Sequence, residues 1–579
     1  MGSRPRIHDL AFVGDRCSTA AVDRSGRICW YCPGRFDGPT VFASLLDPAA
    51  GEWRVLVPDM EDSTRRYLGE SAVLQTRLHT PGGTWTLTDW MPVGAPQQML
   101  CRQLDAAPTD AQVTVDPRPD YGSSAVRLQL LGNDDGGSSV SINQSLCIHA
   151  SLPASVDGPT IRYRIPAGAS AWFVLGPAES ARPSGEDVDR WRQQTLDYWD
   201  TLHERTSYAG PYERQVKASL RALRLLTHSA SGGIIAAATL GLPEVAGGQR
   251  NYDYRYVWLR DAAMIVSALT RAGSDGADER AFLGFLCSAS QHGNNSMPLP
   301  PFVNLDGTAA PATRELPWSG YADSRPVLVG NDAGEQLQLD GLANVLLAAK
   351  LIYNAHQVRD HWETVAEIAD YLAEHWSDAD HGIWEEARVQ QYTASKVVTA
   401  VALGFIAEHS GDPLRAERWR SAARAIRSYV AQHCLTSNGA YAAVAGGEAV
   451  DVSAALFPVW DYCAPDEPAM IATMTRLERD SSTDGLLYRR HLECDDAREE
   501  GAFLAGTFWV AQYWIMRGDL ARAERIIDAA LKFANDVGLM AEEAEPTDGC
   551  MLGNIPQSFV HAALIGAVID LRAAAQTGG

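Results

Sequence analysis

The stretch GDPLRAER, residues 411–418, recurs 107 residues later as GDLARAER, residues 518–525. In each copy the glycine can end one helix and the aspartate can cap the next, so each copy predicts the corner between two antiparallel helices. A helix pair buries only one apolar stripe, and repeated pairs must therefore pack on one another. A closed barrel and an open solenoid both meet this requirement. The long, unequal loops between the helices favour the barrel, with a site at one end.

The sequence changes character near residue 180. Helix-period segments rich in Ala, Leu, Arg and Glu, such as 212–228 and 339–356, dominate the second part. The first part contains short β-rich runs, such as 112–115 and 160–165, separated by turn-forming clusters. We therefore predict a multidomain α+β protein with these parts: an antiparallel β-sandwich over 1–180, a helical linker over 181–210 and a helical domain over 211–579.

Composition and charge exclude several classes of protein. The 579 residues include 49 Lys and Arg against 72 Asp and Glu, and the net charge of −23 disfavours binding to nucleic acids and to anionic membrane surfaces. No apolar run approaches the ~18 residues of a membrane-spanning helix, and the N-terminus lacks the apolar core of a signal peptide. The ten cysteines are spread along the chain, which is typical of a reduced, cytoplasmic protein.

The sequence lacks the usual motifs for metals and nucleotides. Cys29 and Cys32 have CxxC spacing but no second such pair, so we interpret them as buried thiols and not as a zinc site. HExxH, the Walker loop, a GxGxxG that opens a helix and GxSxG are all missing. We therefore expect neither a metal nor a cofactor.

Aromatic and charged residues alternate just before the apolar helix-period run that starts at Ala262. The last of them could simply cap that helix. Together they could also form a polar clamp beside an aromatic wall, which suits a sugar because a sugar has a hydroxyl edge and apolar faces. This segment alone leaves the two interpretations equal, and its residues are Tyr254, Tyr256, Trp258, Arg260 and Asp261.

Two acidic pairs stand in apolar surroundings, namely Glu385-Glu386 after Trp384, and Glu542-Glu543. Each pair alone is more often an ordinary surface feature than a catalytic one. Two separated carboxylates in an aromatic pocket are, however, what inverting glycoside hydrolysis needs: one protonates the leaving oxygen and the other activates water. Trp384 and the negative charge of Glu386 are expected to raise the pKa of Glu385 for the first task.

An ordered series of motifs along nearly the whole chain resembles glycoside hydrolase family 15, the family of glucoamylases and bacterial trehalases. The resemblance implies the two-domain bacterial type, with an N-terminal antiparallel β-sandwich and a C-terminal catalytic (α/α)6 barrel. The motifs lie at 7–15, 35–37, 89–92, 251–261, 324–327, 330–331, 336–340, 382–385, 395–396, 488–489, 500–503, 508–509, 541–543, 553–554 and 556–557.

The resemblance also implies roles for individual residues. Glu385 would be the general acid and Glu542 the general base, with Tyr254 holding the attacking water. Arg260, Asp261 and Arg489 would bind the non-reducing glucose. The other implied substrate-binding residues are Trp258 in the pocket wall, Glu386 toward the leaving group, Trp384 and Tyr256.

The activity implied by the resemblance is exo-acting, inverting hydrolysis that releases β-glucose from short α-glucans or isomalto-oligosaccharides. Two alternatives stay open. One is a trehalase that hydrolyses α,α-trehalose, since actinobacterial-type trehalases are similar in having this pair of domains. Glu386 and Arg490 occupy positions where close relatives vary, which leaves the identity of the substrate open. The other is a non-catalytic carbohydrate-binding or regulatory protein, which the presence of both carboxylates disfavours. We expect a small saccharide as the partner, no nucleic acid or membrane, and allow for a homo-oligomer.

Overall fold

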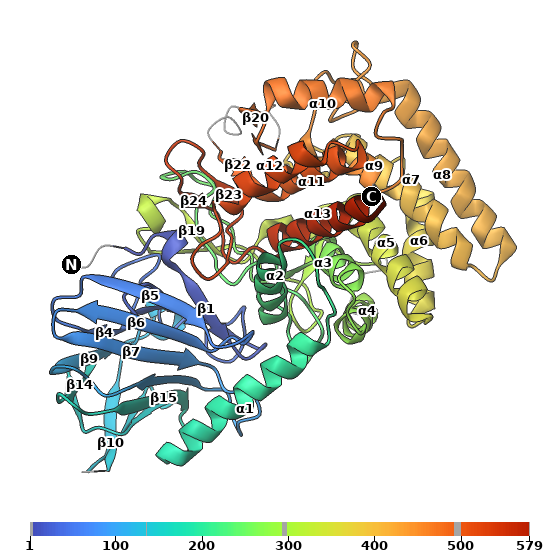
Figure 1. The fold of residues 1–579 in the computed structure, drawn as a ribbon. Helices are drawn as coiled ribbons and strands as arrows, with labels where there is room; N and C mark the ends of the chain where they lie inside the picture. Colours follow the sequence, from blue (N-terminus) through green and yellow to red (C-terminus); the bar gives the residue numbers. More distant parts are fainter. Residues whose placement is uncertain (1–3, 135, 292–297, 491–499, 578–579) are drawn as a thin grey trace. The chain divides into compact units, whose positions relative to one another are not determined.

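The computed structural model describes residues 4–134, 136–291, 298–490 and 500–577. The chain divides into two compact units (Figure 1). The predicted division ended the first domain at residue 180 and treated 181–210 as a linker, whereas the first unit extends to Arg205 and includes two later segments. The first unit comprises Met1–Arg205, Leu316–Val327 and Asn535–Leu539, and the second comprises Thr206–Glu315, Leu328–Ala534 and Met540–Gly579.

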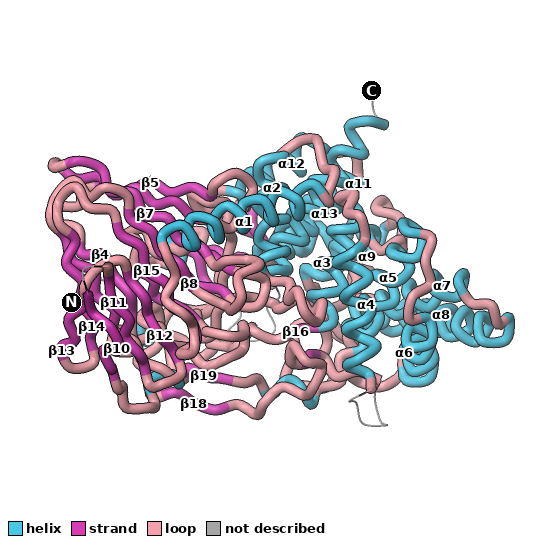
Figure 2. The backbone as a smooth tube through the Cα atoms, turned by 90° about the horizontal axis from the view of Figure 1, so that it is seen from below, coloured by secondary structure: helices cyan, strands magenta, loops and turns pink. Residues whose placement is uncertain are grey.

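The first unit contains two antiparallel sheets that form the predicted sandwich (Figure 2). Within the described residues, the seven-stranded sheet consists, in spatial order, of β1 (Ala11–Gly14), β2 (Thr19–Val22), β3 (Ile28–Tyr31), β4 (Glu52–Leu56), β9 (Ala111–Asp116), β14 (Thr160–Ile165) and β13 (Ala154–Asp157). The eight-stranded sheet likewise consists of β10 (Leu128–Asp134), β11 (Gly137–Ile142), β12 (Leu146–Ala150), β15 (Ala171–Pro177), β8 (Leu100–Leu104), β7 (Gly83–Trp90), β6 (Leu74–Thr80) and β5 (Asp62–Tyr67).

The core of the sandwich is aromatic. Strands β9 and β14 bury alternate residues, the period of two expected for strands with one face on a core. Trp53 of β4 and Tyr163 of β14 both meet Phe173 of β15 in the other sheet, with ring centroids 6.1 and 5.0 Å apart. Cys29 and Cys32 are buried in this unit and form no disulfide.

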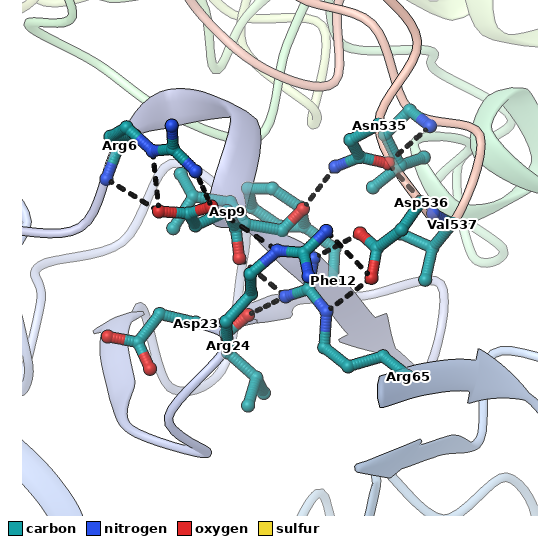
Figure 3. Close-up of polar contacts among 12 residues, drawn as sticks. Arg6, Asp9, Phe12, Asp23, Arg24, Arg65, Asn535, Asp536 and Val537 are labelled. Carbon is teal, nitrogen blue, oxygen red and sulfur yellow. Dashed lines mark hydrogen bonds and ion pairs between the residues drawn. The ribbon is translucent and has the colours of Figure 1, made fainter. Parts of the chain in front are cut away.

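The segment Asn535–Leu539 is hydrogen-bonded into the first unit (Figure 3). The Asn535 side-chain amide donates to the carbonyl of Leu10 (2.7 Å), and its oxygen accepts from the backbone amides two and four residues later. The buried Arg65 side chain pairs with Asp536 at 2.5 Å, and Arg24 also contacts Asp536. Three residues beyond this segment the chain reaches Glu542.

The second unit is the predicted (α/α)6 barrel. Each inner helix contacts the next around the ring, and the last contacts the first. In the part of the chain described, the inner helices are α3 (Leu259–Arg271), α5 (Leu339–His356), α7 (Thr393–Ile406), α9 (Leu456–Val459), α11 (Leu504–Met516) and α13 (Ser558–Thr577). The outer helices are α2 (Glu213–Leu225), α4 (Ala277–Ser290), α6 (Trp362–His375), α8 (Pro413–His433), α10 (Pro468–Asp480) and α12 (Leu520–Leu531).

The repeated motif forms the two corners that it predicts. Asp412 caps the outer helix α8, where its carboxylate accepts from the backbone amides of Leu414 and Arg415. Asp519 caps the outer helix α12 in the same way through the amide of Arg522. Gly518 before it has a φ of +79°, the left-handed conformation in which a helix commonly ends.

Helix α13 is long and apolar enough, by composition, to cross a membrane. The sequence analysis found no such run, because polar residues interrupt the apolar ones. In the structure 67% of this stretch is buried, and α13 packs against α2, α3, α11 and α12. Its apolar faces thus fill the barrel core.

The helical half is expected to be poorly soluble and inactive when produced alone from Ser184 onward. Such a chain keeps Leu316–Val327 and Asn535–Leu539 but loses the surfaces on which they pack. Trp318 would lose Tyr121, 6.0 Å away between ring centroids, and Asn535 would lose its bond to Leu10. Comparing soluble yield and glucose release with the full chain checks this, and a soluble, fully active fragment would contradict it.

Candidate active site

A cavity of about 410 Å³ opens in the helical unit at the N-terminal ends of the inner helices. Arg260 and Asp261 belong to the first turn of α3, and Phe559 belongs to the first turn of α13. Trp384 and Glu385 come from the loop before α7, and Glu542 comes from the loop between α12 and α13. The remaining lining includes Glu244, Arg250, Tyr252, Tyr254, Trp258, Asn331, Gln336, Ile383, Glu386, Arg490, Phe503 and Gln557.

Glu385 is fixed by two donors. Its Oε1 accepts from Trp258 Nε1 at 2.6 Å and from Arg260 Nη2 at 3.2 Å. Its backbone has a φ of +60°, a conformation that costs a non-glycine residue about 1–3 kcal/mol and often marks a functional site. Burial raises the pKa of Glu385, as does the charge of Asp261, while Arg260 opposes the rise. The raising charge is thus chiefly Asp261 and not the expected Glu386.

Glu542 has one bonded and one unbonded oxygen. Its Oε1 accepts from the Tyr254 hydroxyl at 3.0 Å, whereas its buried Oε2 has no hydrogen-bond partner among the described residues. A buried oxygen without a partner is costly, and a bound water or substrate hydroxyl would satisfy it. Burial raises the pKa of Glu542 well above its usual value; the charge of Glu244 adds to the rise and Arg490 opposes it.

Arg260 forms hydrogen bonds with three neighbours in the cavity, one of which is Glu385. It bonds Asp261 Oδ1 (2.9 Å) and the carbonyl of Ile383 (2.7 Å) in addition to Glu385. Asp340 lies 3.9 Å from its guanidinium. Asp261 does not cap α3, whose N-cap position is taken by Trp258 without a side-chain bond, so the plain capping interpretation is wrong.

Arg490 gathers three carboxylates beside the base. Its Nη2 lies 2.5 Å from Glu244, 2.8 Å from Glu500 and 3.3 Å from Glu543. Oxygens from these three glutamates approach within 4.8 Å of one another, a spacing in which a cation could bind. The guanidinium contacts all three and supplies a positive charge there.

The structure places eight of the ten residues that the sequence analysis assigned to the site in the lining of this cavity. The two others are Tyr256 and Arg489. Tyr256 packs behind Trp258, and its hydroxyl reaches Asp253 at 3.3 Å. The neighbour of Arg489, Arg490, faces the cavity instead. The eight residues are Glu385, Glu542, Tyr254, Arg260, Asp261, Trp258, Trp384 and Glu386.

Trp384 shows that a lining residue can be held from outside the cavity. Its indole Nε1 donates to Asp451 at 2.5 Å, and its ring stacks on Trp509 with centroids 6.1 Å apart.

Sequence reasoning missed Glu244 as a neighbour of the base. No spacing in the sequence distinguishes Glu244 from other glutamates, since a tertiary contact brings it to Tyr254.

A larger cavity of about 850 Å³ lies toward the C-terminal ends of the inner helices. Phe559 lines both cavities. The lining of the larger one is mostly apolar, and its polar groups include Arg271 and Gln512, both of which bond Asp570. Neither Glu385 nor Glu542 lines it, so the smaller cavity is the candidate active site.

Gly553→Ala is expected to lower kcat about 10²-fold, because a misplacement of about 1 Å can cost that much. A Cβ at Gly553 would lie 2.7 Å from the Glu542 Cβ and 2.8 Å from its Oε2, and must push the carboxylate aside. Gly549→Ala is the matched control: both glycines have a φ near +75°, but Gly549 has nothing within 4 Å of the added atom. Equal kcat losses in the two variants would contradict the prediction.

Comparisons with known proteins identify the family of the chain. The profile of glycosyl hydrolases family 15 matches residues 210–523 and 520–569, and that of the trehalase-like N-terminal domain matches residues 2–154. A trehalase of Mycobacterium tuberculosis is 30% identical over 98% of this chain and 90% of its own. Trehalase 1 of Sulfolobus acidocaldarius is 29% identical over 99% of both chains.

The fold also matches a solved structure. A crystal structure of a bacterial glucoamylase complexed with acarbose superimposes with a TM-score of 0.72 at 13% identity, covering all of this chain and 96% of that one. The match at this identity concerns the fold alone. From the profile and the full-length relatives, the chain belongs to glycosyl hydrolases family 15 and is a glycoside hydrolase.

Proposed function

We propose that this chain hydrolyses α,α-trehalose with inversion, and yields one β-glucose and one α-glucose. The sequence analysis put short α-glucans first and trehalose second. The relatives named trehalase that match nearly the whole chain favour the second. The cavity volume agrees, since about 410 Å³ lies near the lower end of the roughly 300–1,000 Å³ usual for ligand pockets and suits a disaccharide.

The observation that carries the proposal is a pair of carboxylates in one cavity, the half-buried Glu385 and the buried Glu542. Glu385 serves as the general acid: the raised pKa keeps its proton available, and that proton passes to the glycosidic oxygen as the bond to the anomeric carbon breaks. The leaving glucose keeps its configuration and departs as the α-anomer.

Glu542 serves as the general base. Its unbonded Oε2 accepts a proton from a water molecule, whose oxygen attacks the anomeric carbon on the face opposite to the leaving group. Tyr254 holds the other oxygen of Glu542 and thereby orients the carboxylate. The attacked glucose leaves as the β-anomer.

The other lining residues bind the substrate. Arg260 and Asp261 meet the hydroxyls of the non-reducing glucose, and the rings of Trp258 and Trp384 pack on its apolar faces. Glu386 and Arg490 contact the second, leaving glucose. They therefore determine the specificity of the site for trehalose or for other α-glucosides.

A side-by-side assay tests the proposal. Glucose release is measured on trehalose, maltose, isomaltose, maltotriose and dextran, and a dominant rate on trehalose is expected. Early NMR spectra of the trehalose reaction should show β- and α-glucose in equal amounts. A dominant rate on maltose or isomaltose would make α-glucans the preferred substrates and contradict the proposal. Release of α-glucose alone from trehalose would mean that the reaction retains the anomeric configuration. No glucose release from any of the substrates would favour a non-catalytic protein.

A further inference from the structure

Tyr252 is an exposed aromatic residue in the lining of the active-site cavity. The residue is 39% exposed. The residues proposed to bind the non-reducing glucose are far more buried, with Trp258 at 2%, Asp261 at 4% and Arg260 at 7%. The non-reducing glucose therefore lies at the bottom of the cavity, and Tyr252 lies at its mouth.

The backbone holds the side chain of Tyr252 on the cavity side. Its two neighbours, Asn251 and Asp253, are both 0% exposed, and Asp253 forms a β-bridge. Successive side chains of an extended segment point to opposite sides, so Tyr252 lies on the same side as Tyr254, and both line the cavity. The carbonyl of Tyr252 accepts from the buried Asn554 side chain at 3.0 Å, which fixes the segment in place.

The side chain of Tyr252 offers two groups to a ligand, an aromatic ring and a phenol hydroxyl. Within the part of the chain that the structure describes, the hydroxyl makes no hydrogen bond and the ring stacks on no other aromatic ring. Partial burial and the charge of Glu244 raise the pKa of Tyr252 to about 12, so the hydroxyl keeps its proton and can donate. A ring face beside a hydroxyl donor suits a sugar, which has apolar faces and a hydroxyl edge.

The charged groups that face Tyr252 belong to the side of the cavity from which the second glucose departs. They are Glu244, Arg250, Arg490 and Glu385. In the proposed mechanism the glycosidic oxygen receives its proton from Glu385, so the second glucose must lie beside that carboxylate. Arg490 is proposed to contact the same sugar. A second glucose at the mouth of the cavity is therefore placed next to Tyr252.

We propose that Tyr252 is a specificity-determining residue of the leaving-group subsite, where its ring packs on an apolar face of the second glucose and its hydroxyl donates to that sugar. The inference rests on the hydrolysis proposed above and adds one residue to its substrate site. A leaving group without a sugar ring cannot make these contacts. Tyr252 therefore contributes to the turnover of disaccharides and not to the chemistry at the first glucose.

The test compares trehalose with α-glucosyl fluoride as substrates of Tyr252→Ala. The fluoride substrate fills the site of the first glucose and leaves the mouth of the cavity without a sugar. Loss of the ring should lower kcat/KM on trehalose by about 10–100-fold. The kcat/KM on α-glucosyl fluoride should stay close to that of the wild-type chain. An equal loss on both substrates, or a loss on neither, would overturn the proposal.

Tyr252→Phe separates the ring from the hydroxyl. Phenylalanine keeps the ring and removes one hydrogen bond, so kcat/KM on trehalose should fall by only about 2–10-fold. A loss as large as that of Tyr252→Ala would overturn the packing of the ring on the sugar. If melting temperatures show that Tyr252→Ala is not folded, Tyr252→Leu replaces it, because leucine fills space but has no flat face, and the same selective loss on trehalose is expected.

Tyr371→Ala is the matched control. Tyr371 stacks on His375 of the outer helix α6, with ring centroids 4.2 Å apart, and lies outside the lining of the cavity. The kcat/KM values on both substrates should stay close to those of the wild-type chain. A selective loss on trehalose in this variant as well would show that the ratio responds to remote packing, and would overturn the assignment to Tyr252.

The same measurements distinguish this inference from the proposed substrate. If the wild-type chain prefers maltose or another glucoside to trehalose, the proposed substrate is wrong. The preferred glucoside then replaces trehalose in the comparison, because its leaving group is also a sugar. If the chain shows no turnover, calorimetry compares the binding of trehalose with that of glucose. Tyr252→Ala should weaken only the binding of trehalose, and equal weakening of both would overturn the proposal.

Discussion

Glu542→Gln is expected to lower kcat by about 10²–10⁴-fold on trehalose and on α-glucosyl fluoride alike, the usual contribution of a general base. Both substrates need an activated water, and a glutamine amide cannot accept its proton. Glu385→Gln should lower kcat on trehalose by a similar factor but spare the fluoride, because fluoride leaves without protonation. The ratio of the two substrates therefore identifies which carboxylate is the acid.

A control for these substitutions is Glu545→Gln, since Glu545 lies three residues beyond the base and outside the lining of the cavity. Its kcat should be close to that of the wild type. Reversed substrate ratios would exchange the roles of Glu385 and Glu542. If both Glu542→Gln and Glu385→Gln kept normal turnover of trehalose, neither glutamate would have the catalytic role proposed for it.

The helical half could be predicted because its signals are local. A glycine and an aspartate at a helix corner act within one turn, so GDPLRAER and GDLARAER specify the starts of α8 and α12 without reference to the rest of the chain. The strands β9 and β14 are equally local, because alternation is visible in the sequence. The twelve-helix ring itself came from the family resemblance, since no local signal counts the helix pairs.

The site could be predicted in its residue types and less well in its contacts. Arg260 and Asp261 are neighbours in sequence and remain partners in the structure, 2.9 Å apart. Glu244, by contrast, reaches Glu542 only because the loop before α3 folds back against the loop before α13. The pairing depends on the closed barrel, and a sequence pattern cannot express it.

Two details of the structure differ from the sequence-based prediction, the arginine that faces the cavity and the boundary of the first domain, and both depend on tertiary packing. Arg489 and Arg490 are chemically equal in the sequence, and the backbone alone decides which of them faces the cavity. The boundary at residue 180 was drawn where strands give way to helix, but α1 (Gly185–Glu204) and the distant segment Asn535–Leu539 belong to the first unit. Domain membership follows packing, which can include pieces remote in the sequence.

Arg260→Ala is expected to lower kcat/KM strongly and also to destabilise the fold. Among the described residues, only the Arg260 guanidinium lies within 4 Å of all three carboxylates of Asp261, Asp340 and Glu385. Removing one partner of a buried ion pair costs about 3–5 kcal/mol, because the remaining charges stay buried without a counterion. An acid without Arg260 has a still higher pKa, and the sugar hydroxyls lose a donor, so kcat/KM should fall by about 10²–10³-fold or more.

The comparison with Arg102→Ala separates the two effects. Arg102 forms a fully buried ion pair with Asp89, 2.6 Å apart, but within the β-sandwich. Both variants should lose melting temperature, whereas only Arg260→Ala should lose kcat/KM per folded molecule. Arg260→Lys keeps the charge but not the fork that bonds Asp261, Ile383 and Glu385 at once, so it should recover stability more than activity. If Arg260→Ala lost stability alone, with near-normal turnover by the folded fraction, Arg260 would be a structural residue and the sugar-binding role would pass to other residues of the cavity.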